Sequence, residues 1–183
     1  MLQIERILCP VDFSVFSARA YDYAQSLARH YQAKLLLQHV IEFNLPIYAY
    51  YVPASYMVDQ LQQVRNGAMS QLHEFAKRPA DYGTPPERIL NEGAPADTIL
   101  SFAGVQKVNL IVMGSHGLQG ADRTALGSVT EKVLRKACCS VLVVRSTILS
   151  VLEVRRIRSS CTSFSSVRIF LNIQRRPWST RSP

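Results

Sequence analysis

A chain of 183 residues, of which 48% are hydrophobic, is long enough to bury one good core, so we expect a single folded domain. No apolar run approaches the roughly 20 residues that a membrane span needs. Glu5, Arg6 and Asp12 interrupt any N-terminal signal peptide. These features exclude a membrane protein and predict a soluble protein of the cytoplasm.

The formal net charge of +8 is unevenly placed. The C-terminal segment (residues 146–183) holds seven arginines and one acid, Glu153, a net of +6, which leaves only +2 for residues 1–145. This serine- and arginine-rich composition favours disorder. An extra strand over Val167–Ile173 and an altered reading frame are the alternatives. A basic segment alone is weak evidence for nucleic-acid binding, which we do not expect.

The first third of the chain has a strand-helix-strand pattern. Arg6–Val11 is β-branched and apolar, which predicts a strand, and Lys34–Ile41 predicts a second. Asp12 and Ser14 provide helix-start chemistry between them. Apolar residues then recur at helical spacing, at Ala20, Ala24, Leu27 and Tyr31. This unit is the crossover that a parallel sheet requires.

The middle of the chain begins with a loop, residues 43–56, that is dense in tyrosine and proline. We expect it to cover the sheet edge rather than stack on a ligand. The next helix carries an apolar stripe at helical spacing, which we assign to the core rather than to a cofactor site. The stripe consists of Met57, Leu61, Val64, Ala68, Leu72 and Phe75.

Two further strand-helix units complete the pattern. Glu87–Asn91 predicts a short strand, and Pro95 suits the first turn of the helix that follows. Asn109–Met113 predicts a buried strand, Glu131–Ala137 a helix and Val141–Val144 a last strand. The repeated order predicts an α/β fold, a three-layer sandwich with an open five-stranded parallel sheet and helices on both faces.

A glycine-punctuated loop follows the fourth strand. Gly114 and Gly117 can take positive φ and bring backbone N–H groups close to an anion. Gly127 and Ser128 stand where the next helix begins, and Ser128-x-x-Glu131 fits a capping box with Ser128 at the helix start. Free N–H groups and the positive end of the helix dipole favour phosphate there. This chemistry indicates nucleotide phosphates.

Each of these signals also has a purely structural interpretation. Glycines after a strand are most often turn residues, and a Ser-x-x-Glu box is most often only a cap. The chain has no Gly-x4-Gly-Lys-Ser/Thr and no Gly-x-Gly-x-x-Gly, so neither a P-loop nor the dinucleotide fingerprint is present. No catalytic set is readable, which favours a nucleotide-binding regulatory protein over a dedicated enzyme.

Histidines and cysteines show no metal-ligand or redox spacing. We expect Cys9 to be a small core residue and the adjacent Cys138 and Cys139 to pack at a helix end, without a disulfide framework. His116, inside the glycine loop, is the one histidine with a plausible phosphate-proximal position. We expect it to be a solvent-exposed loop residue.

The spacing Gly114-x2-Gly117-x9-Gly127-Ser128, followed by Val-Thr-Glu-x-Val and Ser-Val-Leu-Val-Val, resembles the nucleotide-binding signature of the universal stress protein family. Residues 7–14, 35–42 and 92–96 resemble the family's first strand and acidic turn, its second strand and its third strand-to-helix junction. The resemblance covers residues 1 to about 145. It implies a Rossmann-like fold of the adenine nucleotide alpha-hydrolase type.

The resemblance also implies a site for ATP at the carboxyl ends of the strands. Pro10, the backbone of Val11 and the apolar side of Val40 would hold adenine, and Asp12 would lie beside base and ribose, although spacing alone makes a helix cap equally plausible for Asp12. Met113 and Gly114 would line the sugar and α-phosphate. The phosphates would fall to Gly117, Gly127, Ser128, Val129 and Thr130.

Partners and activity follow from the same resemblance. Mg²⁺ or Mn²⁺ would be bound through the phosphates and not by a protein cage. Family members commonly dimerise through the strand that is Val141–Val144 here, so a homodimer is expected. The implied function is a stress-response module in which ATP controls dimer or partner contacts. The alternative is a slow ATPase or self-phosphorylating enzyme with Ser128 or Thr130 near the terminal phosphate.

Overall fold

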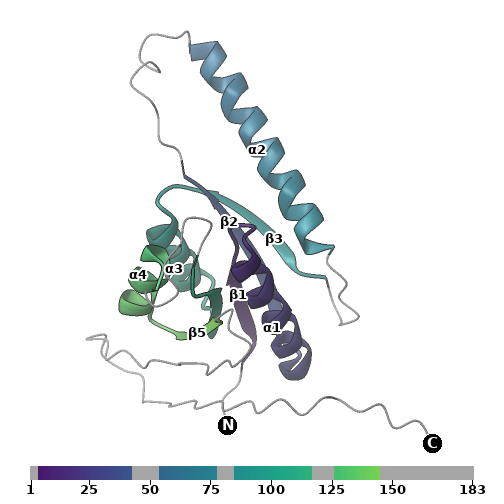
Figure 1. Cartoon of the computed structure of the whole chain (residues 1–183), viewed down its shortest axis with the longest axis vertical. Coiled ribbons are helices and arrows are strands. Elements are labelled where there is room, and N and C mark those ends of the chain that lie inside the picture. Colours follow the sequence, from purple (N-terminus) through teal and green to yellow (C-terminus); the bar gives the residue numbers. More distant parts are fainter. Residues whose placement is uncertain (1–3, 43–53, 78–84, 117–125, 145–183) are drawn as a thin grey trace, which may run out of the picture.

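The computed structural model describes residues 4–42, 54–77, 85–116 and 126–144. These residues form five strands and four helices in strict alternation (Figure 1). The elements are β1 (Arg6–Pro10), α1 (Val15–Tyr31), β2 (Lys34–Ile41), α2 (Ala54–Ala76), β3 (Glu87–Glu92), α3 (Pro95–Val105), β4 (Leu110–Gly114), α4 (Ser128–Lys136) and β5 (Ser140–Val144). The predicted five-stranded α/β fold is confirmed.

All pairings in the sheet are parallel, and the strand order is β3-β2-β1-β4-β5. The chain first builds β1, β2 and β3 outward in one direction and then returns to place β4 on the other side of β1. The order therefore reverses between β1 and β4. In sheets of this class, ligands bind beyond the carboxyl ends of the strands at such a switch point.

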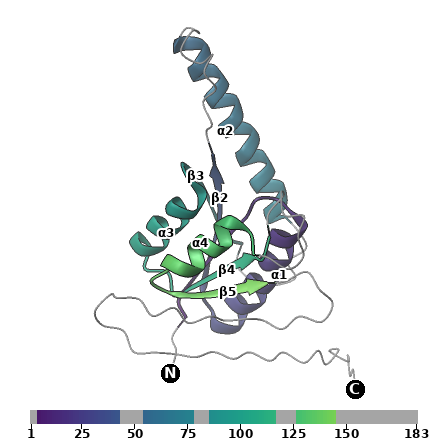
Figure 2. The same ribbon diagram turned by 60° about the vertical axis from the view of Figure 1, so that its left-hand side comes forward.

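Side-chain alternation along the strands produces two cores, one on each face of the sheet. Ile7, Cys9 and Leu37 face the layer of α1 and α2, where Tyr21 of α1 is fully buried. Leu8, Leu36, Ile111 and Met113 face the opposite layer, formed by α3 and α4. Helices on both faces give the predicted three layers (Figures 1 and 2).

Helix α1 begins with a side-chain cap. The backbone N–H of Ser17 donates to Ser14 Oγ at 3.2 Å, and Ser14 Oγ donates to Asp12 Oδ1 at 2.6 Å. Ser14, rather than Asp12, is thus the capping residue. Ala20 and Ala24 are buried as predicted, whereas Tyr31, the last residue of α1, is 40% exposed, although Ala28 in the same turn is still buried in the core.

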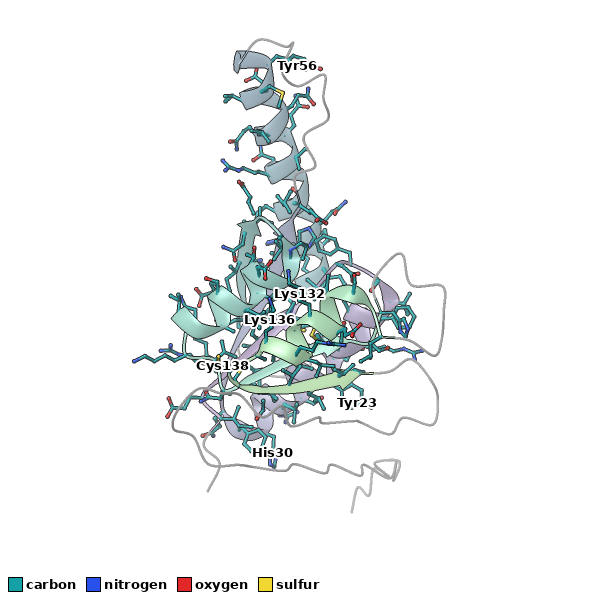
Figure 3. The ribbon with its side chains drawn as sticks, turned by 90° about the vertical axis from the view of Figure 1, so that its left-hand side faces the viewer. Tyr23, His30, Tyr56, Lys132, Lys136 and Cys138 are labelled. Carbon is teal, nitrogen blue, oxygen red and sulfur yellow. The ribbon has the colours of Figure 1, made fainter. Side chains whose placement is uncertain are left out.

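The assignment of the whole α2 stripe to the core is wrong. Leu72 is fully buried and Phe75 packs against the same core, but Val64 is 46% exposed and Met57, Leu61 and Ala68 are only half-buried. The cause is the position of the helix. Its C-terminal part lies on the sheet, while its N-terminal part extends beyond the rest of the described fold (Figures 1 and 2). In Figure 3, Tyr56 marks the far end of α2.

The remaining expectations concern the tyrosine-rich loop, the cysteines, membrane spans and the C-terminal segment. Residues 54–56, assigned to the tyrosine-rich loop, already belong to α2, and the rest of that loop lies outside the described residues. Cys9 is buried as expected, but Cys138 is exposed and so does not pack. None of the described helices is long and apolar enough to span a bilayer. The C-terminal segment lies outside the described residues.

Candidate functional site

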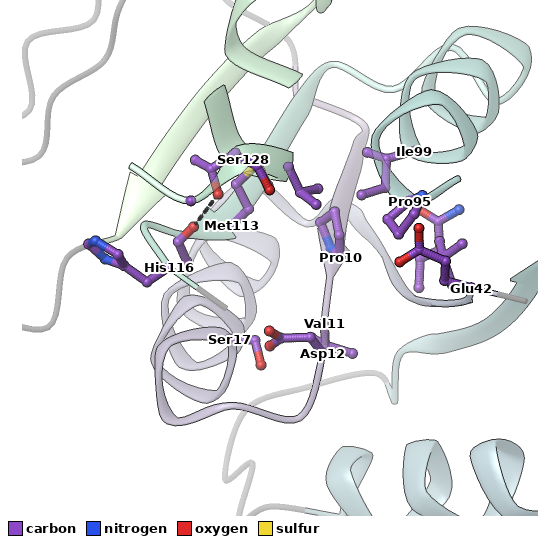
Figure 4. A pocket seen from close by; sticks show the side chains of 16 residues that line it. Pro10, Val11, Asp12, Ser17, Glu42, Pro95, Ile99, Met113, His116 and Ser128 are labelled. Atoms are coloured by element: carbon purple, nitrogen blue, oxygen red, sulfur yellow. Dashed lines mark hydrogen bonds between the residues drawn. The ribbon is translucent and has the colours of Figure 1, made fainter. Parts of the chain in front are cut away.

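A pocket of about 570 Å³ opens at the carboxyl ends of β1, β2 and β4, where the strand order reverses (Figure 4). This volume is in the range of small-molecule sites. Helix α3 supplies one wall and the start of α4 another. The described lining residues are Pro10, Val11, Asp12, Ser17, Gln38, Val40, Glu42, Pro95, Ile99, Met113, Gly114, His116, Gly127, Ser128, Val129 and Thr130.

The end of β1 is held by hydrogen bonds to β2. Val11 N–H donates to the carbonyl of Gln38 at 2.8 Å, and the carbonyl of Val11 lies 2.8 Å from His39 Nδ1. The backbone of Val11 therefore already has internal partners, and only the second lone pair of its carbonyl can accept from a ligand. Asp12 follows at once, with Oδ1 accepting from the backbone N–H of Ser14 at 3.1 Å.

The start of α4 is fixed over the end of β4 by backbone hydrogen bonds. Ser115 N–H donates to the carbonyl of Val144 at 2.9 Å, and Gly127 N–H donates to the carbonyl of Ser115 at 2.8 Å. Gly114 has no room for a side chain, because a Cβ there would lie 2.9 Å from the backbone carbon of Phe16. The helix terminus and the strand end thus form one rigid corner of the pocket.

The predicted capping box at Ser128 is wrong. The N-cap of α4 is Gly127 and no side chain of the described residues caps this end, so Ser128 is the first helical residue. The first bond of α4 runs from Glu131 N–H to the carbonyl of Gly127 at 2.9 Å. The N–H groups of Ser128, Val129 and Thr130 precede it and have no helical acceptor. Since all three residues line the pocket, the positive end of α4 is turned towards it.

The two hydroxyl groups of this helix end differ. Thr130 is buried, and its hydroxyl donates to the carbonyl of Gly114 at 2.9 Å. Ser128 is exposed at the pocket surface. The Thr130 hydroxyl thus helps to hold α4 on β4, and its proton is already in use. Ser128 is the hydroxyl that a ligand can contact freely.

Charge is distributed unequally around the pocket. The carboxylates Asp12 and Glu42 lie at the ends of β1 and β2, and none of the lining residues that the structure describes is Lys or Arg. Any anion bound by these residues would depend on backbone N–H groups and the helix dipole. Outside the pocket, Lys132 on α4 donates to Asp97 on α3 at 2.6 Å, which lowers the pKa of the Asp97 carboxyl and ties the two walls together.

The expectation for His116 is also wrong. Its side chain is only 9% exposed, its ring centroid lies 5.4 Å from that of Phe16, and Nδ1 lies 2.9 Å from Ser115 Oγ. It is buried because the corner of β4 packs against α1. Nε2 has no partner among the described residues. In Figure 4 the ring of His116 points away from the other labelled side chains.

The structure brings together ten of the eleven residues that the sequence assigns to the site. Gly117 lies outside the described residues. Sequence reasoning did not assign six of the lining residues to the site: Ser17, Gln38, Glu42, Pro95, Ile99 and His116. The parallel pairing of Pro10 with Gln38 places Gln38 at the pocket, and no short sequence motif predicts this position. Among the described residues, no cluster of His, Cys, Asp and Glu could hold a metal ion.

Comparison with known proteins matches residues 3–145 to the universal stress protein family. Universal stress protein YxiE of Bacillus subtilis is 34% identical over 145 residues, which are 76% of this chain and 98% of that protein. The solved structure of MJ0577 of Methanocaldococcus jannaschii superposes with a TM-score of 0.68 at 28% identity, covering 79% of this chain and 98% of that one.

A universal stress protein solved in complex with cAMP superposes with a TM-score of 0.60 at 25% identity, covering 79% of this chain and 99% of that one. The matched region contains every described strand and helix of the present structure. The chain belongs to the universal stress protein family.

Proposed function

We propose that the pocket binds ATP, and that the protein is a stress-response module in which the bound nucleotide controls dimer or partner contacts. Residues 1–145 are the functional domain in this proposal, with the C-terminal segment as an appendage. The nucleotide class is supported by the family, by the relative solved with cAMP and by the geometry of the pocket.

The observation that carries the proposal is the open N-terminus of α4. Three consecutive N–H groups, those of Ser128, Val129 and Thr130, have no helical acceptor and belong to the pocket lining. Phosphate oxygens are suitable acceptors for such groups, and the helix dipole favours their charge. Gly114 lets the chain pass close to Phe16 at this corner, which brings the helix end to the pocket.

The remaining walls fit a nucleoside at the other end of the pocket. Pro10, Val40 and Ile99 offer apolar surface for a flat base, and the carboxylates of Asp12 and Glu42 can accept from sugar hydroxyls. Keeping the carboxylates away from the α4 end avoids repulsion with the phosphates. Mg²⁺ or Mn²⁺ is proposed to be held by the phosphate oxygens, with water completing its shell.

A second candidate function, slow hydrolysis or self-phosphorylation, is favoured by one observation. Ser128 is an exposed hydroxyl at the proposed phosphate end, whereas the hydroxyl proton of Thr130 is donated to Gly114. Of the two predicted acceptors, Ser128 is therefore the one to test. Incubation with labelled ATP should modify the parent and not the Ser128→Ala variant; label that persists in this variant would exclude Ser128.

The ATP proposal is tested by removing one backbone donor. Proline is tolerated at the first position of a helix, so Ser128→Pro should retain α4 while deleting its first N–H, and Ser128→Ala is the control that retains this N–H. We expect Mg-ATP, after removal of any copurified nucleotide, to raise the unfolding temperature of the parent and of Ser128→Ala, and to raise that of Ser128→Pro much less.

A ligand at about 100 times its Kd adds roughly 2.7 kcal/mol to the free energy of unfolding, so the shift is readily measured. Circular dichroism of the variants without ligand checks that the fold is retained. A parent protein that is folded and nucleotide-free, yet shows no shift with Mg-ATP, would contradict the proposal. An equal shift in Ser128→Pro would contradict the role of the helix end.

A further inference from the structure

Two pocket-lining residues, Gln38 and His116, each have a buried polar atom without a partner in the described part of the chain, and the His116 ring points away from the other labelled side chains of the pocket (Figure 4). Gln38 is fully buried on β2, and its side-chain oxygen, Oε1, makes no hydrogen bond with the described residues. Its side-chain nitrogen, Nε2, donates to Asn91 Oδ1 on β3 at 2.9 Å. Leaving a buried acceptor unpaired costs roughly 1–3 kcal/mol. The amide is thus oriented by Asn91, and the acceptor of this pocket-lining residue is unused.

The sheet register places this acceptor at a defined distance from the phosphate corner. Gln38 is paired with Pro10 of β1 and lies on β2, and β2 is two strands away from β4 in the sheet order. Neighbouring strands are about 4.8 Å apart, so Gln38 is roughly 10 Å across the sheet from the strand that leads to α4. A nucleotide whose phosphates lie at α4 would direct its base towards β2.

We propose that Gln38 reads the 6-position of the purine, accepting a hydrogen bond from an amino group through Oε1. This inference rests on the proposed nucleotide function and adds a residue that selects the base. A 6-amino group donates to the free oxygen, whereas a 6-oxo group places a second acceptor against it. Adenine is therefore accepted and hypoxanthine, which differs from adenine at this edge, is disfavoured.

Asn91 acts as a positioning residue in this account. Because Asn91 Oδ1 accepts from Nε2 of Gln38, the amide cannot turn its nitrogen towards the base without losing that bond. Removing the side chain of Asn91 would free the amide to present either atom. A site that can present donor or acceptor no longer distinguishes amino from oxo, so selectivity would fall even though the base contacts Gln38 and not Asn91.

The test compares three magnesium nucleotides on the full chain by titration calorimetry: ATP, inosine triphosphate and purine riboside triphosphate, which carries hydrogen at the 6-position. We expect the parent to bind ATP about tenfold or more tightly than either analogue, as expected when a buried polar group loses its partner. Gln38→Leu and Gln38→Met should bind all three within about threefold of one another.

Two further variants separate base reading from general effects on the fold. Asn91→Ala should lower the ratio of ATP to inosine triphosphate affinity, and Asn91→Asp, which keeps an acceptor for Gln38, should preserve it. Gln25 is a second buried glutamine, on α1 and outside the pocket lining. Gln25→Leu should leave the ratio unchanged, whatever it does to stability.

The outcomes also separate this inference from the function on which it rests. If ATP binds but inosine triphosphate binds equally well to the parent, Gln38 does not read the base, and the ATP proposal stands. The same conclusion follows if the preference for ATP survives in both Gln38 variants. If no triphosphate binds to folded, nucleotide-free protein, the proposed function and the base reading both fail. The comparison among ligands on the parent needs no variant to fold.

Discussion

Gly114 is the residue at which one added atom should most disturb the phosphate corner. A Cβ at this position would meet the backbone carbon of Phe16 at 2.9 Å and its carbonyl oxygen at 3.1 Å. Backbone atoms cannot rotate aside as a side chain can. Gly114→Ala should therefore lower the free energy of unfolding by about 1–3 kcal/mol, the usual cost of overpacking, as measured by urea denaturation.

Gly67 provides the matched control because it lies within α2 and has open space where a Cβ would be built. Alanine there reduces the freedom of the unfolded chain without a clash, so Gly67→Ala should stabilise the protein by about 0.5–1 kcal/mol. Equal effects at the two glycines would show that crowding at Phe16 does not govern Gly114.

The two serines at helix starts should also respond differently. Ser14 Oγ accepts from Ser17 N–H and donates to Asp12, so Ser14→Ala should cost about 1 kcal/mol or somewhat more. Ser128 makes no capping bond, and Ser128→Ala should change stability by less than about 0.5 kcal/mol. Thermal unfolding without ligand measures the stability change of both variants. A loss of stability in Ser128→Ala as large as that in Ser14→Ala would contradict the absence of a capping bond at Ser128.

At the residue scale, the sequence predicted which residues lie at the site more accurately than it predicted the role of each one. The glycine spacing and the family resemblance assigned Gly114, Gly127 and Thr130 to the site, and all three line the pocket. The prediction of a cap at Ser128 was wrong because the Ser-x-x-Glu spacing is equally compatible with a helix that begins one residue earlier, with Gly127 as its N-cap. Gln38 was missed because a single polar residue in an apolar strand does not reveal whether it faces a core or a cavity.

At the scale of single elements, α2 shows what periodicity measures. The spacing of its apolar residues correctly predicted a helix with an apolar face. It could not predict how much of that face would be covered, because cover depends on where neighbouring elements end. Leu72 and Phe75 pack on the core, whereas Val64, nearer the N-terminus of α2, is 46% exposed.

Truncations along the α2 stripe should therefore differ in cost. Leu72→Ala removes a fully buried side chain and should lower the free energy of unfolding by about 2–5 kcal/mol. Val64→Ala removes a side chain that is 46% exposed and should cost no more than about 0.5 kcal/mol. Denaturant titration of both variants measures the difference. A loss at Val64 as large as that at Leu72 would mean that α2 is covered in solution along its whole length.

At the scale of the whole molecule, the parallel sheet with helices on both faces could be predicted from the sequence because each strand-helix unit is local, whereas the strand order came from the structure. Short apolar runs separated by amphipathic segments leave few alternatives to a parallel sheet with a helix layer on each face. The reversal of order between β1 and β4 then determined the position of the pocket. The length of α2 beyond the sheet edge depends on the packing of the whole chain, so a local pattern could not predict it.

The sheet ends at β5, which has β4 as its only neighbour in the described structure. An edge strand offers unpaired backbone groups to another chain. Because we propose a dimer through Val141–Val144, sedimentation velocity of the full chain should give twice the mass of one chain at micromolar concentration. A single species with the mass of one chain, with or without Mg-ATP, would contradict pairing through this edge.

The ring contacts beside the pocket have a mechanical consequence. Phe13, with a φ of 64°, is part of the turn after Asp12, and its ring centroid lies 4.3 Å from that of His39 and 5.6 Å from that of Phe75, in the last turn of α2. A helix of 23 residues is about 35 Å long. A tilt of about 10° at this anchored end would displace the far end by roughly 6 Å over that length. Such a tilt would move Phe75 against Phe13 in the turn that follows Asp12, and it would also have to break the ion pair between Arg65 on α2 and Glu92 at the end of β3.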